Sequence, residues 1–407
     1  MSTTLLQQAT IVHTAVTNDL HDVLIGDVLI TDGIIAEVGP AITTPADEMV
    51  DLRDHLLLAA AVEPHAHLDK AFLAEHAENV TGDLLGAIDA MISLGGKIDE
   101  ADIVDRAERA ARLMAANGYV AVRTHADTTT WSGLRNTQAL VEVRRRVADV
   151  IDVEIVALCG SPVVGVAGAD HRALLRDALA AGADLVGGCP HLEDDGDIEA
   201  STDVFLEIAV EAGVGVDLHT DETLDSTVLG LEYLARQVLA GFPHSVTASH
   251  CVSLGQQTAA QQQRVAELVA AAGIGVVTLP HTNLWLGGRD QQPVPRGLTA
   301  VGALRAAGVA VAAGADNLQD PFNPMGRACP FETAGLMVLV AHDLIDTAWR
   351  AVSSDVRRVV GLGGGSIEPG QVADLLAVRA STLRSAIAEG PPGRRVWRRG
   401  VETTPRS

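Results

Sequence analysis

The chain has 407 residues, of which 47% are hydrophobic, 20% are charged and only 3% are aromatic. This composition is typical of a globular protein and excludes an intrinsically disordered chain. The formal net charge of −24 repels nucleic acids and anionic membranes, so neither is an expected partner, and no apolar stretch reaches the roughly 18–20 residues that span a bilayer.

The two ends of the chain share a pattern of short strands and turns. Near the N-terminus, two β-branched runs flank Asp32-Gly33, a pair that favours a tight hairpin turn. Similar strand and turn patterns return in residues 366–407. We therefore predict that residues 1–58 and 366–407 form one composite β-sandwich domain. The basic run at 394–399 is expected to be a solvated strand face or an inter-domain contact.

Residues 59–365 alternate between short apolar strands and Ala-rich helical patterns. We expect eight strands, at 57–62, 119–123, 152–158, 184–186, 214–218, 245–248, 274–279 and 309–313. This order predicts an α/β fold, a (β/α)8 TIM barrel over residues 59–365. A doubly wound sheet is the alternative. The barrel is favoured because reactive side chains follow nearly every strand, where barrel enzymes keep their active sites.

Several side chains capable of chemistry stand at these strand ends: His65 and His67, His125 and Asp127, His219, Asp221 and Glu222, His250, and Asp316 and Asn317. A single histidine at such a position is usually structural. In an extended strand, however, residues i and i+2 face the same side, so His65-Ala66-His67 directs two imidazoles to one point. Three histidines and one aspartate suit one divalent metal ion, Zn²⁺ or Fe²⁺, with a position left for water.

Such a metal lowers the pKa of its water toward about 7 and so supplies a nucleophile at neutral pH. Glu222, three residues after His219, is the candidate for moving the proton; the alternative is a carboxylate that stabilises a helix N-terminus. Asp316 is a candidate ligand and base. His250 is a candidate for holding the hydroxide or the developing oxyanion. These three residues are the predicted catalytic set.

The four cysteines, Cys159, Cys189, Cys251 and Cys329, form no C-x-x-C motif. The first residues have neither the basic nor the apolar region of a signal peptide. We therefore expect free thiols and a cytoplasmic protein.

Six motifs, VEPHAHLDK, VRTHADTT, DLVGGCPHLE, DLHTDET, VTASHCVSL and ADNLQDPFNPMG, lie between residues 62 and 326, and the similarity that they carry spans nearly the whole chain. Together they resemble the amidohydrolase superfamily and, within it, the cytosine deaminase group. The resemblance implies a homo-oligomeric barrel enzyme with one zinc or iron ion, a proton shuttle at Glu222 and a small N-heterocyclic substrate. It places the metal ligands at His65, His67, His219 and Asp316. No lysine follows the fourth strand, so a two-metal site on a carbamylated lysine is not expected.

The specificity residues depart from the cytosine deaminase pattern. Gly160 stands where those enzymes have a glutamine that reads the pyrimidine, Asn317 replaces an aspartate, and Phe322 replaces a tryptophan. Lys70 is similar to the triazine-catabolic branch, which lacks the carboxylate kept here as Glu222. The residues assigned to substrate binding are Lys70, Gly160, Asn283, Asn317 and Phe322.

The expected reaction is hydrolytic deamination at the C–NH₂ of cytosine or a related pyrimidine or triazine. Two other hydrolytic reactions stay open, namely release of an alkylamine and opening of a cyclic amide. Outside catalysis, a metal-free barrel acting as a binding scaffold is the remaining alternative.

Overall fold

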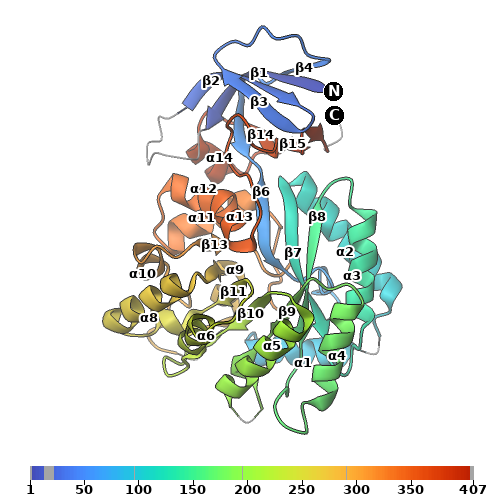
Figure 1. The fold of residues 1–407 in the computed structure, drawn as a ribbon, viewed down its shortest axis with the longest axis vertical. Helices are drawn as coiled ribbons and strands as arrows, with labels where there is room; N and C mark the ends of the chain where they lie inside the picture. The colour runs from blue at the N-terminus through green and yellow to red at the C-terminus, as the bar shows by residue number, and fades with distance from the viewer. Residues whose placement is uncertain (1, 13–22, 96, 195, 290, 404–407) are drawn as a thin grey trace.

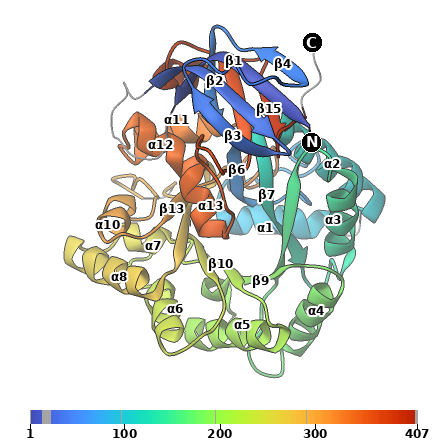
Figure 2. The same ribbon diagram turned by 45° about the horizontal axis from the view of Figure 1, so that its top comes forward.

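The computed structural model describes residues 2–12, 23–95, 97–194, 196–289 and 291–403. Its larger part is a parallel, nearly closed barrel in which eight strands are neighbours in chain order (Figure 1, Figure 2). The barrel strands are β6 (Ala61–Ala66), β7 (Tyr119–Thr128), β8 (Asp152–Cys159), β9 (Leu185–Gly188), β10 (Val216–Thr220), β11 (Val246–His250), β12 (Gly275–Thr278) and β13 (Val311–Ala313). The predicted TIM barrel is therefore confirmed.

The first and last barrel strands meet at the end where the candidate residues lie. Ala66 and Asp316 form an isolated parallel bridge, and the Asp316 N–H donates to the His65 carbonyl at 3.1 Å. This contact brings the eighth strand's carboxylate beside the first strand's two imidazoles, as closure of a barrel requires.

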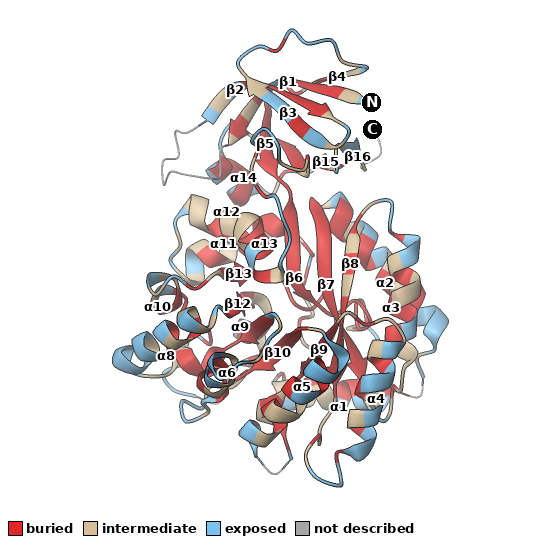
Figure 3. Ribbon diagram, in the orientation of Figure 1, coloured by how far each residue is buried: buried red, intermediate tan, exposed pale blue. Residues whose placement is uncertain are grey.

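Helices surround the barrel, with buried inner faces and exposed outer faces (Figure 3). They are α1 (Leu84–Leu94), α2 (Glu100–Ala116), α3 (Arg135–Arg146), α4 (Ala169–Ala180), α5 (Ile198–Ala212), α6 (Gly230–Leu239), α7 (Val252–Gly255), α8 (Ala259–Ala272), α9 (Pro280–Leu286), α10 (Val301–Ala306), α11 (Pro330–Val340), α12 (Ile345–Val352), α13 (Ser354–Val360) and α14 (Leu383–Glu389), with a 3₁₀ turn at Pro190–Leu192. Gly213 and Gly273 end α5 and α8 in the left-handed conformation, which turns the chain into the next strand. In the described part of the chain, no helix combines the length and hydrophobicity needed to cross a bilayer.

The smaller part is one mixed sheet built from both ends of the chain, in the order β16-β15-β14-β5-β1-β2-β3, with β4 also paired to β1. Its strands are β1 (Thr3–Val12), β2 (Val23–Thr31), β3 (Ile34–Gly39), β4 (Glu48–Asp51), β5 (His55–Ala59), β14 (Leu375–Arg379), β15 (Arg395–Arg398) and β16 (Val401–Glu402). The predicted turn at Asp32-Gly33 joins β2 to β3, and both of its residues have positive φ. The division of the chain at 58/59 and 365/366 stays a prediction.

The predicted strand at 57–62 is in fact two strands. Residues up to Ala59 pair with β14 of the small sheet, and residues from Ala61 pair with β7 of the barrel. The chain changes sheets at Ala60, whose N–H donates to the Asp374 carbonyl at 3.0 Å. Every residue from His55 to Ala66 is buried, so no alternation of polar and apolar residues marks the change.

The basic run at 394–399 forms an inter-domain contact, one of the two roles predicted for it. Arg398 and Arg399 both pair with Asp152 at the start of β8, and Arg394 donates to the Asn117 carbonyl after α2. These guanidinium groups therefore hold the small sheet against the barrel.

Candidate active site

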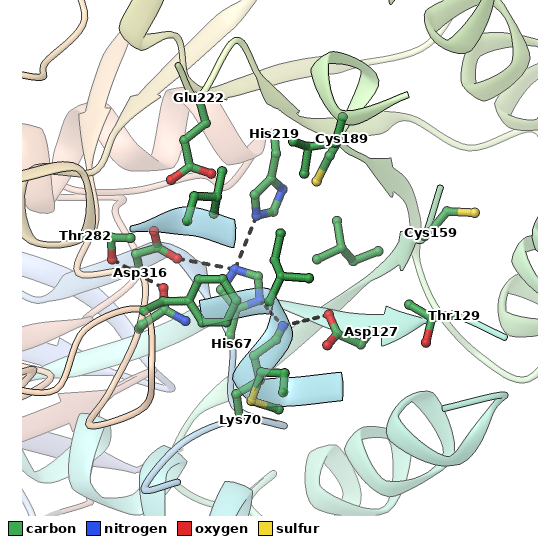
Figure 4. A pocket seen from close by; sticks show the side chains of 18 of the residues that line it. His67, Lys70, Asp127, Thr129, Cys159, Cys189, His219, Glu222, Thr282 and Asp316 are labelled. Carbon is green, nitrogen blue, oxygen red and sulfur yellow. Dashed lines mark hydrogen bonds and ion pairs between the residues drawn. The ribbon is translucent and has the colours of Figure 1, made fainter. Parts of the chain in front are cut away.

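Four buried side-chain atoms converge at the C-terminal end of the barrel, and Figure 4 shows three of their residues, His67, His219 and Asp316. The Nε2 atoms of His65 and His67 each lie 3.2 Å from Nε2 of His219. Asp316 Oδ1 lies 3.5 Å from His65 Nε2 and 3.3 Å from His67 Nε2. The structure thus brings together the four residues predicted as metal ligands, from β6, β10 and the loop after β13.

This donor set fits one divalent metal ion with a coordination position left for water. Neighbouring ligand atoms about 2.0–2.1 Å from such an ion stand about 2.9–3.4 Å from one another, close to the four separations given above. Burial lowers the pKa of all three imidazoles well below the ordinary value, so each is neutral and has a lone pair to offer. Neither carboxylate oxygen of Asp316 has a hydrogen-bond partner among the described residues. Buried acceptors without donors are expected where a cation binds.

Glu222 and His250 lie together beside this cluster. Glu222 Oε1 is 3.2 Å from His250 Nδ1, and the Asn283 amide nitrogen reaches both, at 3.2 Å and 2.9 Å. Because Asn283 donates to Nδ1, the hydrogen of a neutral His250 ring sits on Nε2, which has no partner among the described residues. Burial, followed by the charge of Asp316, raises the pKa of Glu222 well above its ordinary value. The pair therefore offers a proton carrier and a free N–H donor.

Backbone strain is concentrated at the same strand ends. Asp316 and His250 have φ values of 63° and 68°, a region that residues other than glycine rarely adopt. Such conformations persist where the surrounding structure holds them and are common at functional sites.

Glu63, which sequence reasoning did not single out, helps to hold the loop that bears Asp316. Its carboxyl group accepts from the Ala315 N–H at 3.1 Å and from the His65 N–H at 3.3 Å. Burial raises the pKa of Glu63 to about 8. The signal available in the sequence was its spacing, because Glu63, His65 and His67 recur at i, i+2 on one face of a strand.

Lys70 forms a buried ion pair at the site. Its Nζ lies 2.7 Å from Asp127 Oδ1, 3.9 Å from Asp69 Oδ1 and 3.0 Å from His67 Nδ1. Burial alone would lower the pKa of Lys70, but the two carboxylates outweigh it and raise that pKa above its ordinary value. The lysine is therefore a permanent cation with donors directed at the site.

These groups border a cavity with an empty volume of about 740 Å³, including its opening to solvent. Its apolar wall comes mainly from α1, with additional side chains from β8, the 3₁₀ turn and two loops; the apolar residues are Leu84, Ile88, Met91, Ile92, Trp131, Leu158, Leu192 and Phe322. A mostly apolar pocket with a few convergent polar groups suits a small planar ligand.

The residues assigned to substrate binding lie at or next to this cavity. Lys70, Gly160, Asn317 and Phe322 line it, whereas Asn283 borders a neighbouring cavity and contacts the Glu222–His250 pair. A β-carbon on Gly160 would lie 2.9 Å from a ring nitrogen of His171, which packs against this position.

Two other strand-end residues are not among the four predicted ligands, although a ring nitrogen of His125 lies within 4.8 Å of ligand atoms of His65 and His219. The His125 ring is fully buried behind His65, with 3.9 Å between the ring centroids. The Asp221 carboxylate accepts from the Gly230 and Leu231 N–H groups at 3.1 and 2.8 Å, so it caps the start of α6.

Comparison with known proteins agrees with this site. The amidohydrolase family model matches residues 74–403. A pterin deaminase of Rhizobium rhizogenes is 34% identical over 92% of this chain and 86% of its own length. The crystal structure of 5-methylcytosine deaminase from Klebsiella pneumoniae has a TM-score of 0.88 and 28% identity, covering 99% of this chain and 98% of that one.

A third similar protein is named for the removal of an isopropylamino group instead of ammonia. The structure of N-isopropylammelide isopropylaminohydrolase from Burkholderia multivorans has a TM-score of 0.84 and 29% identity, over 99% of this chain and 98% of that one. The matches to a family model and to a relative extend over most of the chain and include the segments that carry Glu222, His250 and Asp316. The chain therefore belongs to the amidohydrolase family, as a hydrolase of C–N bonds other than peptide bonds.

Proposed function

We propose that the protein is a metal-dependent aminohydrolase that replaces the exocyclic amino group of a cyclic N-heterocycle with oxygen and releases ammonia. The observation that carries the proposal is the convergence of four donor atoms, with neighbouring atoms 3.2–3.5 Å apart, three of whose residues line a largely apolar cavity. His65, His67, His219 and Asp316 would hold one Zn²⁺ or Fe²⁺ ion, and these ligand types suit both metals.

When bound, the ion would lower the pKa of a water molecule and supply the nucleophile. Glu222 would accept the proton that this water loses and pass it to the amino nitrogen, which leaves as ammonia. The free Nε2–H of His250 would donate to the oxygen as it adds to the ring carbon. The hydrogen that remains on the added oxygen moves to the adjacent ring nitrogen, so water and the N=C–NH₂ unit are converted into a ring lactam (N–H and C=O) and ammonia.

Lys70 and Asp127, which lie across the site from Glu222, indicate the substrate class. Figure 4 shows Lys70 and Glu222 on opposite sides of His67. Lys70 offers donors for a ring carbonyl oxygen, and Asp127 offers an acceptor for an adjacent ring N–H. The preferred substrate would therefore carry an amidine-type C–NH₂ and a lactam edge, as cytosines, pterins and amino-oxotriazines do. The apolar wall from α1 would cover the faces of the ring.

The test is an ammonia-release screen of the protein loaded separately with Zn²⁺ and with Fe²⁺. The panel should contain cytosine, 5-methylcytosine, pterin and an amino-oxotriazine, with mass spectrometry to show replacement of NH₂ by oxygen. We expect release from at least one member and none from the metal-free protein. Stoichiometric metal without ammonia from any member would contradict the proposal.

A second candidate reaction, release of an alkylamine, is favoured by one observation. A second cavity of about 1050 Å³, including its opening, shares Leu84, Leu192 and Glu222 with the first. Its further lining includes the apolar side chains of Leu224, Val228 and Leu286. Because Glu222 would protonate the leaving nitrogen, an alkyl group on that nitrogen would lie in this second cavity.

The two reactions are separated by pairing the best amino substrate with its N-isopropyl analogue. Leu224→Trp would fill the second cavity, whereas Leu224→Ala would enlarge it. If the second cavity receives the alkyl group, the tryptophan variant loses isopropylamine release but keeps ammonia release, and the alanine variant keeps both. Failure of the wild-type protein to release any isopropylamine would remove this candidate without affecting deamination.

A further inference from the structure

A chain of buried hydrogen bonds extends from one metal-ligand imidazole into the barrel interior. His65 Nδ1 lies 3.0 Å from Ser249 Oγ, and Ser249 Oγ donates to Asp217 Oδ1 at 2.9 Å. Arg123 Nη1 donates to the other oxygen, Asp217 Oδ2, at 2.8 Å. The exposed fractions of His65, Ser249 and Asp217 are all 0%, so bulk solvent does not compete for these hydrogen bonds.

The Asp217 carboxylate determines which atom donates in each of these hydrogen bonds. An ionised carboxylate can only accept, so Ser249 must donate its hydroxyl hydrogen to Asp217. Ser249 then has only lone pairs left for His65, and the Nδ1 atom of His65 must carry the ring hydrogen. A neutral imidazole has one hydrogen, so Nε2 is left with the lone pair. Nε2 is the atom that faces His219 and Asp316.

The other two imidazoles have no comparable acceptor in the described part of the chain. His219 Nδ1 has no hydrogen-bond partner there. The neighbour of His67 Nδ1 is the Lys70 amine at 3.0 Å, which can only donate when protonated and so favours the ring hydrogen on Nε2, the opposite of what Ser249 does for His65. A metal ion on His67 Nε2 would therefore require Lys70 to release Nδ1. Among these three imidazoles, His65 is the ligand whose hydrogen-bond partner in the described part of the chain leaves Nε2 free for a metal ion.

We propose that Asp217, acting through Ser249, fixes the tautomer of His65 and thereby sets how tightly the centre holds its metal ion. Both are positioning residues. The inference rests on the metal centre of the proposed function, but it concerns metal affinity and needs no substrate. Hydrogen-bonded groups behind a metal ligand are worth about 10–100-fold in metal affinity.

Arg123 makes this proposal sharply testable. In Asp217→Asn, the guanidinium of Arg123 requires the amide oxygen, so the amide NH₂ must face Ser249. Ser249 would then accept from the amide and donate to His65 Nδ1. That reversal places the ring hydrogen on Nε2, where it blocks the metal. Ser249→Ala, in contrast, removes the chain without reversing it, so His65 remains free to adopt either tautomer.

The experiment compares four proteins: wild type, Ser249→Ala, Asp217→Asn and the double variant. Metal dissociation constants would be measured by competition with a chelator, and the ligand field would be followed by the visible spectrum of the Co²⁺ forms. We expect Ser249→Ala to bind metal about 10–100-fold more weakly than wild type, and Asp217→Asn more weakly still. The double variant should regain the affinity of Ser249→Ala, because the reversed hydrogen bond can no longer reach His65.

A purely structural role for Asp217 predicts a different order, with the double variant at least as impaired as Asp217→Asn. That result, or wild-type affinity in Ser249→Ala, would overturn the proposal. If Asp217→Asn and the double variant do not fold, Ser249→Ala alone still tests the proposal. Its metal affinity and its Co²⁺ spectrum must both differ from those of the wild type. A protein that binds metal as expected but deaminates nothing would contradict the proposed function and leave this inference standing.

Discussion

Glu222→Gln is expected to separate catalysis from metal binding. In the wild-type protein the Asn283 amide nitrogen donates to Glu222 Oε1 at 3.2 Å. Glutamine keeps the size of the side chain and an oxygen that can still accept this hydrogen bond. It cannot carry a proton. Loss of a proton-transfer group costs about 10²–10⁴ in rate, which is about 2.7–5.4 kcal/mol of transition-state stabilisation at 1.36 kcal/mol per tenfold. No Glu222 atom belongs to the four-atom donor cluster, so the bound metal should stay at the wild-type level.

The assay is single-turnover ammonia release at neutral pH, with metal content measured on the same samples. Glu199→Gln is the matched control, because it makes the same chemical change at an exposed position in the first turn of α5 and should leave the rate and the metal content unaltered. A Glu222→Gln protein with full metal and full turnover would refute the assignment of the proton carrier. Loss of the metal together with the activity would instead move Glu222 into the ligand set.

Three further changes test the surroundings of the site. Lys70→Met should raise KM at least tenfold and lower the free energy of unfolding by about 3–5 kcal/mol, because a buried carboxylate loses its partner; unchanged KM would remove Lys70 from substrate binding. Gly160→Ala should cost about 1–3 kcal/mol in a urea titration, because its β-carbon would press on His171, and a neutral result would show that His171 moves aside. Glu232→Gln should cost about 1 kcal/mol. Since the hydrogen bonds from Arg264 lower the pKa of Glu232 to about 2, this cost should be constant above about pH 5 and fade as the pH falls toward 2; a cost that grows in acid would contradict the pairing.

The barrel could be predicted because each strand and helix has its own local signal. The alternation of apolar strands and Ala-rich helices is visible without knowledge of any long-range contact. The prediction of a single strand at residues 57–62 was wrong because no local signal marks the boundary between β5 and β6. β5 pairs with β14, more than three hundred positions later in the chain, and uniform burial hides the change of sheet at Ala60.

The convergence of the four candidate metal ligands could be predicted because two geometric rules place them together. Residues at i and i+2 of a strand share a face, and the strand ends of a barrel meet at one rim. The groups behind them, Glu63, Ser249 and Asp217, follow no such rule. A serine or a carboxylate in a strand has many ordinary uses, and only the packed structure shows that Glu63 and Ser249 contact His65 and that Asp217 contacts Ser249.

The bridge between Ala66 and Asp316 has a consequence for how the barrel holds together. Here the circle of strands is completed by an isolated bridge between the first and last strands, separated by about 250 positions in the chain, at the level of the four donor atoms. An ion bound there would link the two ends of the barrel in addition to its role in catalysis, because His65 and His67 lie on the β6 side of this junction and Asp316 lies on the β13 side. Removing the ion should therefore loosen the barrel first between β6 and β13, so hydrogen exchange along β6 would report occupancy of the site even where no substrate is known.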